Sequence, residues 1–166
     1  MDWSILVSIF LFYAILVGLN IPASFLGIEF ERDSKPKLWY QPPGFVIPII
    51  WFVLFAMLAL SRHHLLQIGH DELQWPLFIL AFICAAYAYY TIGLSKVTGI
   101  SVSWLGLAGN MIVILFAGYT TYVIYPESIF SALLVVPTIL WTALASLIIV
   151  GEMKLKKDTP PTAGHH

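Results

Sequence analysis

Apolar residues are gathered into five long runs, and the charged residues lie between these runs. The runs cover approximately residues 3–27, 44–60, 75–94, 100–125 and 129–151. Each is long enough for a helix to cross the hydrocarbon core of a bilayer, which needs about 20 predominantly apolar residues. No Asp, Glu, Lys, Arg or His occurs inside any of the five runs. The pattern predicts an all-α membrane protein, a bundle of five transmembrane helices.

The five runs define one domain and a tail. The transmembrane domain is expected to cover residues 1–153, and a basic polar tail follows at residues 154–166. His165 and His166 at the end of the tail are typical of an expression-tag remnant, so we leave them out of the functional interpretation.

Composition and charge support membrane insertion and exclude one class of partner. Sixty per cent of the 166 residues are apolar and 10% are charged, whereas about a quarter of the residues of a soluble domain are charged. Eight basic residues nearly balance nine acidic ones, so no basic field exists that would attract nucleic acid. The expected partners are membrane lipids and a hydrophobic small molecule. A proton pump or ion-coupled transporter is disfavoured, because such proteins usually need ionisable groups at membrane depth.

The distribution of basic residues predicts an orientation. Five spans place the first connection, residues 28–41, on the same side as the carboxyl tail. Seven of the eight basic residues share that side: Arg32, Lys35, Lys37, Lys96, Lys154, Lys156 and Lys157. By the positive-inside rule, the first connection and the tail are expected to be cytoplasmic. The first connection is also the longest, which is typical of a lid or binding loop.

Aromatic residues and prolines mark the start of the second run. Pro42 and Pro43 are expected in the first turn of a helix, where the missing amide hydrogen would be unpaired in any case. Trp39 and Tyr40 precede them and are expected at the level of the lipid headgroups. Trp51 and Phe55 are four residues apart, so they should share a helix face.

A histidine-rich stretch and one cysteine raise alternative site hypotheses. His63 and His64 lie beside Arg62 and are followed by His70. We expect them in a solvated connection rather than as haem ligands. Cys84 lies inside an apolar run, where a small buried hydrophobe is the ordinary interpretation. The sequence contains no nucleotide-binding glycine pattern and no metal motif, so no catalytic or metal site is expected.

Two segments resemble the signature of a known family. In the second run and the residues before it, the matching positions are Lys37, Tyr40, Pro42, Pro43, Phe45, Trp51, Leu54 and Phe55. In the last run they are Pro137, Trp141 and Ala145. The chain resembles the TspO family, also called translocator protein or tryptophan-rich sensory protein. Ala85, Thr138 and Ile149 stand where Asn, Tyr and Asn are usual, which indicates a divergent member.

The resemblance implies a ligand cavity under the first connection, with the two tryptophans Trp51 and Trp141 in its wall. The other candidate ligand-binding residues are Phe55, Trp39, Tyr40, Pro42, Pro43, Ala145, Asn20, Tyr87 and Tyr90. Asn20 could instead serve helix packing. Tyr87 and Tyr90 could donate hydroxyl hydrogen bonds to a ligand. Small residues such as Gly106 and Gly109 are expected at a close helix contact.

Three functions remain open at this point. The first is an integral membrane binding protein for hydrophobic planar ligands, such as the tetrapyrroles protoporphyrin and haem, in sensing, sequestration or transport. The alternatives are a light-dependent porphyrin-degrading enzyme and a sterol or lipid transporter. The resemblance further implies a homodimer, and no cofactor is required, although porphyrin or haem could be the ligand.

Overall fold

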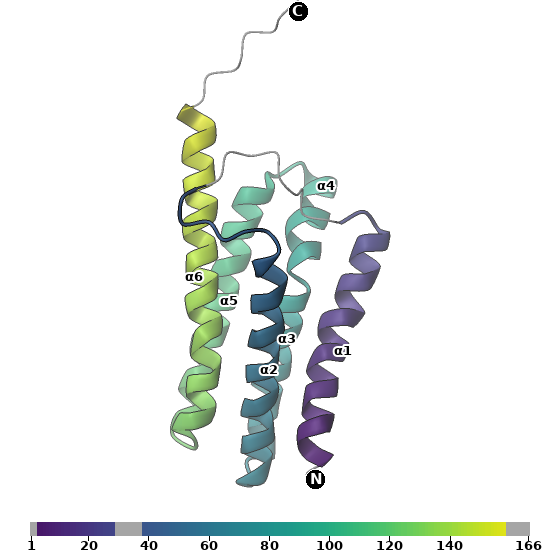
Figure 1. The fold of residues 1–166 in the computed structure, drawn as a ribbon, viewed down its shortest axis with the longest axis vertical. Coiled ribbons are helices and arrows are strands. Elements are labelled where there is room, and N and C mark those ends of the chain that lie inside the picture. Colours follow the sequence, from purple (N-terminus) through teal and green to yellow (C-terminus); the bar gives the residue numbers. More distant parts are fainter. Residues whose placement is uncertain (1–2, 29–37, 159–166) are drawn as a thin grey trace, which may run out of the picture.

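The fold is an all-helical bundle (Figure 1). The computed structural model describes residues 3–28 and 38–158, with side chains up to residue 155. Its elements are α1 (Trp3–Phe25), α2 (Val46–Gln67), the 3-10 turn η1 (Asp71–Leu73), α3 (Gln74–Ala85), the π-helical turn η2 (Tyr89–Gly93), α4 (Leu94–Thr98), α5 (Val102–Ile124) and α6 (Ile129–Asp158). Helices α1, α2, α5 and α6 are long and apolar enough to cross a membrane, and α3 with η2 and α4 adds a fifth span if the bent pair counts as one. The prediction of an all-α membrane protein is confirmed.

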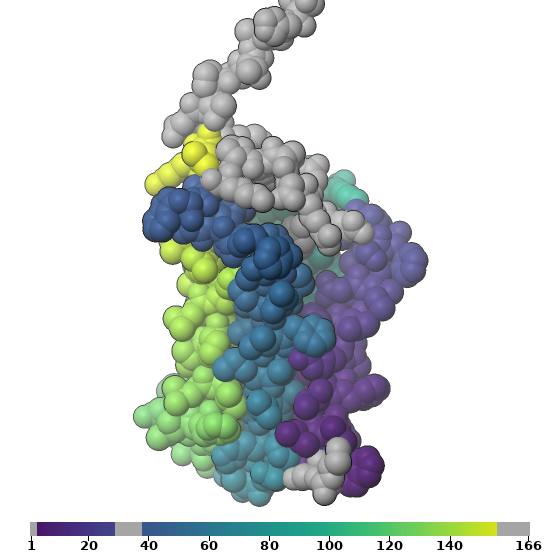
Figure 2. Space-filling model, in the orientation of Figure 1, coloured from purple at the N-terminus to yellow at the C-terminus, as the bar shows by residue number. Residues whose placement is uncertain are grey.

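The helices close into a ring. Contacts join α1 to α2, α2 to α6, α6 to α5, α5 to α3 and α3 back to α1. On the face shown in Figure 2, α2 runs between α6 and α1. The lower end of the bundle in Figure 1 carries the start of α1 and the α2–α3 and α5–α6 connections. The upper end carries the end of α1, the start of α2, α4 and the end of α6.

Buried side chains are concentrated in the half of the bundle nearer the lower end, which we call the lower half. One apolar cluster fills it, with members from all five helical segments, among them Phe12, Leu58, Leu80, Val113 and Val135. Packing is sparser in the upper half. There, none of the described residues 13–22 of α1, 46–53 of α2 and 143–155 of α6 is buried. The predicted lid, residues 28–41, lies outside the described residues except for Ile28 and 38–41, and so do tail residues 159–166.

Several hydroxyl side chains inside the helices donate to a carbonyl of their own helix. Ser8 Oγ donates to the Ser4 carbonyl at 2.8 Å and Thr120 Oγ1 to the Phe116 carbonyl at 2.8 Å. Thr142 Oγ1 donates to the Thr138 carbonyl at 2.7 Å. A polar group facing hydrocarbon is costly unless it is hydrogen-bonded. This bond to the carbonyl four residues back therefore lets Ser and Thr occupy spans without a partner on another helix.

Aromatic side chains are exposed at both ends of the bundle. At the lower end Trp3 and Trp75 are exposed, and at the upper end Trp39 and Trp104 are exposed. Amphipathic rings favour the two membrane–water interfaces. The two sets are what a bundle spanning a bilayer would present to the headgroups.

The third apolar run is not one straight helix. The segments Asp71–Ala85 and Tyr89–Thr98 meet at an angle of 50°. Side chains supply hydrogen bonds at the bend: Thr91 Oγ1 donates to the Tyr87 carbonyl at 2.6 Å. Tyr89 Oη donates to the Leu19 carbonyl of α1 at 2.7 Å. The first bond satisfies a carbonyl at the bend, and the second attaches the bend to α1.

Helix α2 differs from the prediction at both ends. It begins at Val46, three residues after Pro43, whose carbonyl accepts from the Val46 amide at 2.9 Å. Pro48, and not the Pro42–Pro43 pair, therefore occupies the first turn. At its other end α2 continues to Gln67. The prediction of a solvated connection was wrong for His63 and His64, which are helical.

Helix α2 continues there because the polar residues of its last turns find partners on neighbouring helices. Ser4 Oγ lies 2.7 Å from His63 Nδ1. Arg62 is 9% exposed, and its guanidinium donates to Ser8 Oγ at 2.7 Å and to Gln74 Oε1 at 2.9 and 3.1 Å. A buried cation is tolerated in a span when such partners replace water. Arg62 thus ties α1, α2 and α3 together at the lower end.

Candidate ligand-binding site

Trp51 and Phe55 lie on one face of α2. Phe55 is completely buried and Trp51 is half-buried at the edge of the apolar cluster. Their ring centroids are 6.4 Å apart with an interplanar angle of 67°, an edge-to-face arrangement favoured by the ring quadrupoles. The expected shared face is confirmed. Phe55 supports Trp51 from below, and part of the indole remains accessible.

Trp141 and Ala145 lie one turn apart on α6, the helix that packs beside α2. Both are half-buried. Thr138, one turn before Trp141, is 1% exposed, and its Oγ1 has no hydrogen-bond partner among the described residues. Along this stretch of α6, Trp141 and Ala145 are partly accessible, whereas the Thr138 hydroxyl is enclosed by the bundle.

The residues that precede α2 are attached to the upper end of α6. Tyr40 Oη donates to the Leu147 carbonyl at 3.3 Å, and Gln41 Nε2 donates to Glu152 Oε1 at 3.0 Å. A Cβ at Gly151 would overlap Tyr40 Oη and the side chain of Leu38. Gly151 thus lets the side chains of Leu38 and Tyr40 lie directly against α6, and a larger residue there would displace their ends.

The remaining aromatic and proline candidates before α2 point in different directions. Trp39 is 94% exposed and touches Tyr40 edge to face, with centroids 5.4 Å apart. Pro42 is half-buried and Pro43 is exposed. The structure brings Tyr40 to α6 and leaves Trp39 at the surface, and ligand contact by either stays a prediction.

Tyr87 and Tyr90 form a pair between the bent third run and α5. Their rings are 5.4 Å apart and nearly perpendicular. Tyr87 Oη donates to the Gly106 carbonyl at 3.3 Å and Tyr90 Oη to the Ile83 carbonyl at 3.1 Å. A Cβ at Gly109 would overlap the Tyr90 ring. The glycines of α5 therefore make room for tyrosine rings, and a ligand would have to compete with backbone carbonyls for the phenolic protons.

Two asparagines in the spans differ in exposure: Asn20 lies on the outside of the bundle and Asn110 lies inside it. Asn20 is exposed, and its Nδ2 donates to the Leu16 carbonyl of its own helix at 2.8 Å. Asn110 is 3% exposed, and its Nδ2 donates to Ser146 Oγ of α6 at 3.1 Å. Sequence reasoning did not include Asn110 among the candidates. The available signal was an amide at membrane depth, which usually finds a partner on another helix.

Comparison with known proteins decides the family. The TspO/MBR family model matches residues 5–152. The chain belongs to the TspO/MBR family. A tryptophan-rich sensory protein of Cereibacter sphaeroides is 26% identical over 164 residues, which are 96% of this chain and 96% of that protein. The resemblance inferred from the two tryptophan-containing segments is confirmed.

The family match spans every candidate residue and the whole ring of helices. Trp51 and Phe55 lie on α2, Trp141 and Ala145 lie on α6, and these two helices are in contact. Tyr40 is attached to α6 through Leu147. A separate shallow apolar groove on α2 is lined by Pro48, Ile49 and Phe52. Ile49 and Phe52 are exposed in an apolar span, so we interpret this groove as a lipid-facing surface.

Proposed function

We propose that this member of the TspO/MBR family is an integral membrane sensory or binding protein for a hydrophobic planar ligand of the tetrapyrrole class, such as protoporphyrin or haem. The ligand would lie in the upper half of a five-span bundle, between Trp51 and Trp141. The observation that carries the proposal is the pair of half-buried tryptophans on adjacent helices, in the half where packing is sparse. The relative's designation as a sensory protein supports the same class of role.

The chemistry of the candidate site suits such a ligand. A conjugated macrocycle gains about 0.5–1.5 kcal/mol per ring from offset stacking on an aromatic face, in addition to its buried area. Phe55 holds Trp51 edge to face, so little side-chain freedom is left for a ligand to remove. Binding, rather than passage along the bundle axis, is further supported by the close packing of the lower half.

Titration of protoporphyrin or haemin, followed by the ligand's own absorption band, tests this proposal. Trp51→Phe and Trp141→Phe should each weaken binding about two- to tenfold, the equivalent of one stacking contact. Trp104→Phe is the matched control, because Trp104 is 62% exposed on the surface of α5. Absence of saturable binding, or an equal loss in the control, contradicts the proposal. Light-dependent loss of the band with a distinct product would favour the degrading enzyme instead.

Orientation and assembly complete the proposal. We expect the upper end to be cytoplasmic, because Lys96 and Lys154 lie there and Arg62 lies at the lower end. Single cysteines introduced at each end, labelled by an impermeant maleimide in intact cells, check this orientation. The homodimer implied by the family stays a prediction, and light scattering of the detergent-solubilised protein checks it.

A further inference from the structure

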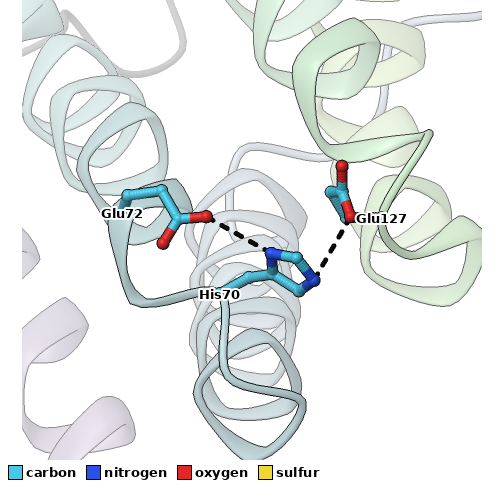
Figure 3. A network of polar contacts seen from close by, with 3 residues as sticks. All are labelled: His70, Glu72 and Glu127. Carbon is cyan, nitrogen blue, oxygen red and sulfur yellow. Dashed lines mark hydrogen bonds and ion pairs between the residues drawn. The ribbon is translucent and has the colours of Figure 1, made fainter.

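Three ionisable side chains meet at the lower end, away from the candidate ligand site (Figure 3). His70 lies in the α2–α3 connection, and its Nδ1 is 3.2 Å from Glu72 Oε1 of η1. Its Nε2 is 3.2 Å from Glu127 Oε2, which belongs to the α5–α6 connection. One imidazole ring therefore bridges two connections that are more than fifty residues apart in the sequence.

Each of the two contacts needs a hydrogen on the ring nitrogen that faces the carboxylate. A neutral imidazole carries hydrogen on one nitrogen only, and the other nitrogen is an acceptor. If the nitrogen without hydrogen faced a carboxylate, its lone pair would point at the lone pairs of a carboxylate oxygen, and the contact would be repulsive. Only the imidazolium donates to Glu72 and Glu127 at once. The observed geometry is thus complementary to the charged form of His70.

We propose that His70 is a proton-dependent clamp, which joins the α2–α3 connection to the α5–α6 connection most strongly when the imidazole is charged and more weakly when it is neutral, because the neutral ring has one N–H to share between two carboxylates. The ligand proposed above plays no part in this clamp. The elements on either side are the starts of α3 and α6. Ser128 caps α6 by accepting from the Ser131 amide at 3.1 Å, so Glu127 is held at a fixed position just before that cap.

The other ionisable groups nearby are engaged with different helices. Arg62 at the end of α2 is bound by Ser8 of α1 and Gln74 of α3, and His63 lies against Ser4 of α1. His64 packs its ring against Phe130 of α6, with centroids 5.1 Å apart. Asp71 is exposed beside Glu72, and its charge acts on Arg62. Glu72 and Glu127 are the carboxylates in direct contact with His70.

The Glu72 carboxylate and the His70 imidazole together limit the clamp to a range of pH. The pKa of Glu72 is lowered, first by a hydrogen bond from its own backbone and then by the bond to His70. Its contribution is present above the ordinary glutamate range and is lost only as the pH falls through the lowered value. Only the charged ring of His70 donates to both carboxylates, so one of the two contacts is lost when the ring becomes neutral as the pH rises. The clamp should be strongest under mildly acidic conditions.

Hydrogen exchange of the purified full chain between pH 5 and 8 tests the clamp. Rates are divided by the intrinsic rate at each pH, and the amides of residues 66–73 and 125–131 are compared. Both segments of the wild type should lose about two- to fivefold protection together as the pH rises, the scale of a partly exposed ion pair. In His70→Gln the protection should be low and independent of pH. Glu127→Gln should lower protection at acidic pH and abolish the parallel response of the two segments.

His63→Gln is the matched control, because it removes a histidine from the same end that lies against Ser4 of α1. It should retain the wild-type pH profile. The proposal is overturned if His70→Gln keeps that profile, or if it loses protection equally at pH 5 and pH 8, as a purely structural residue would. It is also overturned if the two segments of the wild type respond to pH independently.

Discussion

The two halves of the bundle are built from the same helical segments, yet they are held together in different ways. In the lower half, Leu58, Leu80 and Val135 are fully or almost fully buried in one apolar cluster. In the upper half, Trp51 and Trp141 are half-buried at corresponding places on α2 and α6. The difference separates two tasks: the lower half fixes the helices, and the upper half leaves aromatic surface available.

Some of the polar contacts at the two ends differ in whether they end on a side chain or on a backbone carbonyl. At the lower end, side chains bind side chains, as in the bonds of Arg62 to Ser8 and Gln74. At the upper end, several ties end on backbone carbonyls, such as those from Tyr40 to Leu147 and from Lys96 to Gly27, the latter at 2.7 Å. A carbonyl is present whatever residue carries it. The bonds from Tyr40 and Lys96 therefore constrain the partner's side chain less than the bonds of Arg62 do.

The largest expected effect comes from the lower core. Leu80→Ala should lower the free energy of unfolding by about 2–5 kcal/mol, because the cavity left by a fully buried leucine is filled only in part. Leu115→Ala is the control, since Leu115 is 65% exposed on α5. Reversible denaturation in mixed micelles measures both. Equal losses for the two variants would remove the distinction between a packed half and the lipid-facing surface.

The second-largest loss of stability is expected when the Arg62 side chain is removed. Arg62→Ala should cost about 2–4 kcal/mol, because the guanidinium makes three hydrogen bonds and lies 5.2 Å from the centroid of Phe78, and bonds to a charged group are worth about 1.5–3 kcal/mol each. Arg62→Lys should recover only part of this loss, because an ammonium lacks the planar fork. Full recovery with lysine, in the same denaturation assay, would show that charge alone matters there.

A change in the upper half should have an intermediate effect. In Gly109→Ala the added methyl group overlaps the Tyr90 ring, and overpacking of this kind costs about 1–3 kcal/mol. In Gly118→Ala the Cβ meets nothing within 4 Å. That variant should be neutral, or more stable by up to about 1 kcal/mol, because alanine favours helix. Thermal unfolding followed by circular dichroism distinguishes the two, and similar melting temperatures would contradict the close packing of Tyr90.

The smallest effect should come from the bond between Asn110 and Ser146. A double-mutant cycle with Asn110→Ala and Ser146→Ala should give a coupling energy of about 0.6 kcal/mol, the usual size of an interhelical hydrogen bond in a membrane protein. The cycle cancels the separate packing losses of each variant. A coupling energy of zero would mean that α5 and α6 are joined by packing alone.

Two of the apolar runs coincide with helices over most of their length. Helix α5 lies inside the run 100–125, and α6 begins with the run 129–151 and continues to Asp158. Ser128 caps α6 by accepting from the Ser131 amide. The continuation of α2 to Gln67 was missed because it depends on partners elsewhere in the chain. Ser8 lies 54 residues before Arg62 and Gln74 lies 12 residues after it. No local pattern contains that information.

The bend in the third run and the start of α2 show the same limit. Residues 86–88 read Ala-Tyr-Ala and contain no helix breaker, and one of the bonds at the bend comes from Tyr89 to Leu19 on another helix. At α2 the helix-starting role was assigned to Pro42 and Pro43, although Pro48 could also occupy a first turn. For the candidate site, the shared face of Trp51 and Phe55 followed from their spacing, whereas the attachment of Tyr40 to α6 did not.

The hydroxyl groups that bond to their own helix have a consequence for biogenesis. In α5, Thr120 and Thr121 bond to the carbonyls four residues back, so these two groups need no partner from another helix when the segment leaves the translocon, whereas Asn110 finds its partner Ser146 only when α6 follows. Helix α2 has a different requirement, because Gln74, which binds Arg62, is synthesised after it. We therefore expect α2 to leave the translocon in company with the following segment, which makes the hairpin of α2 and α3 a unit of insertion.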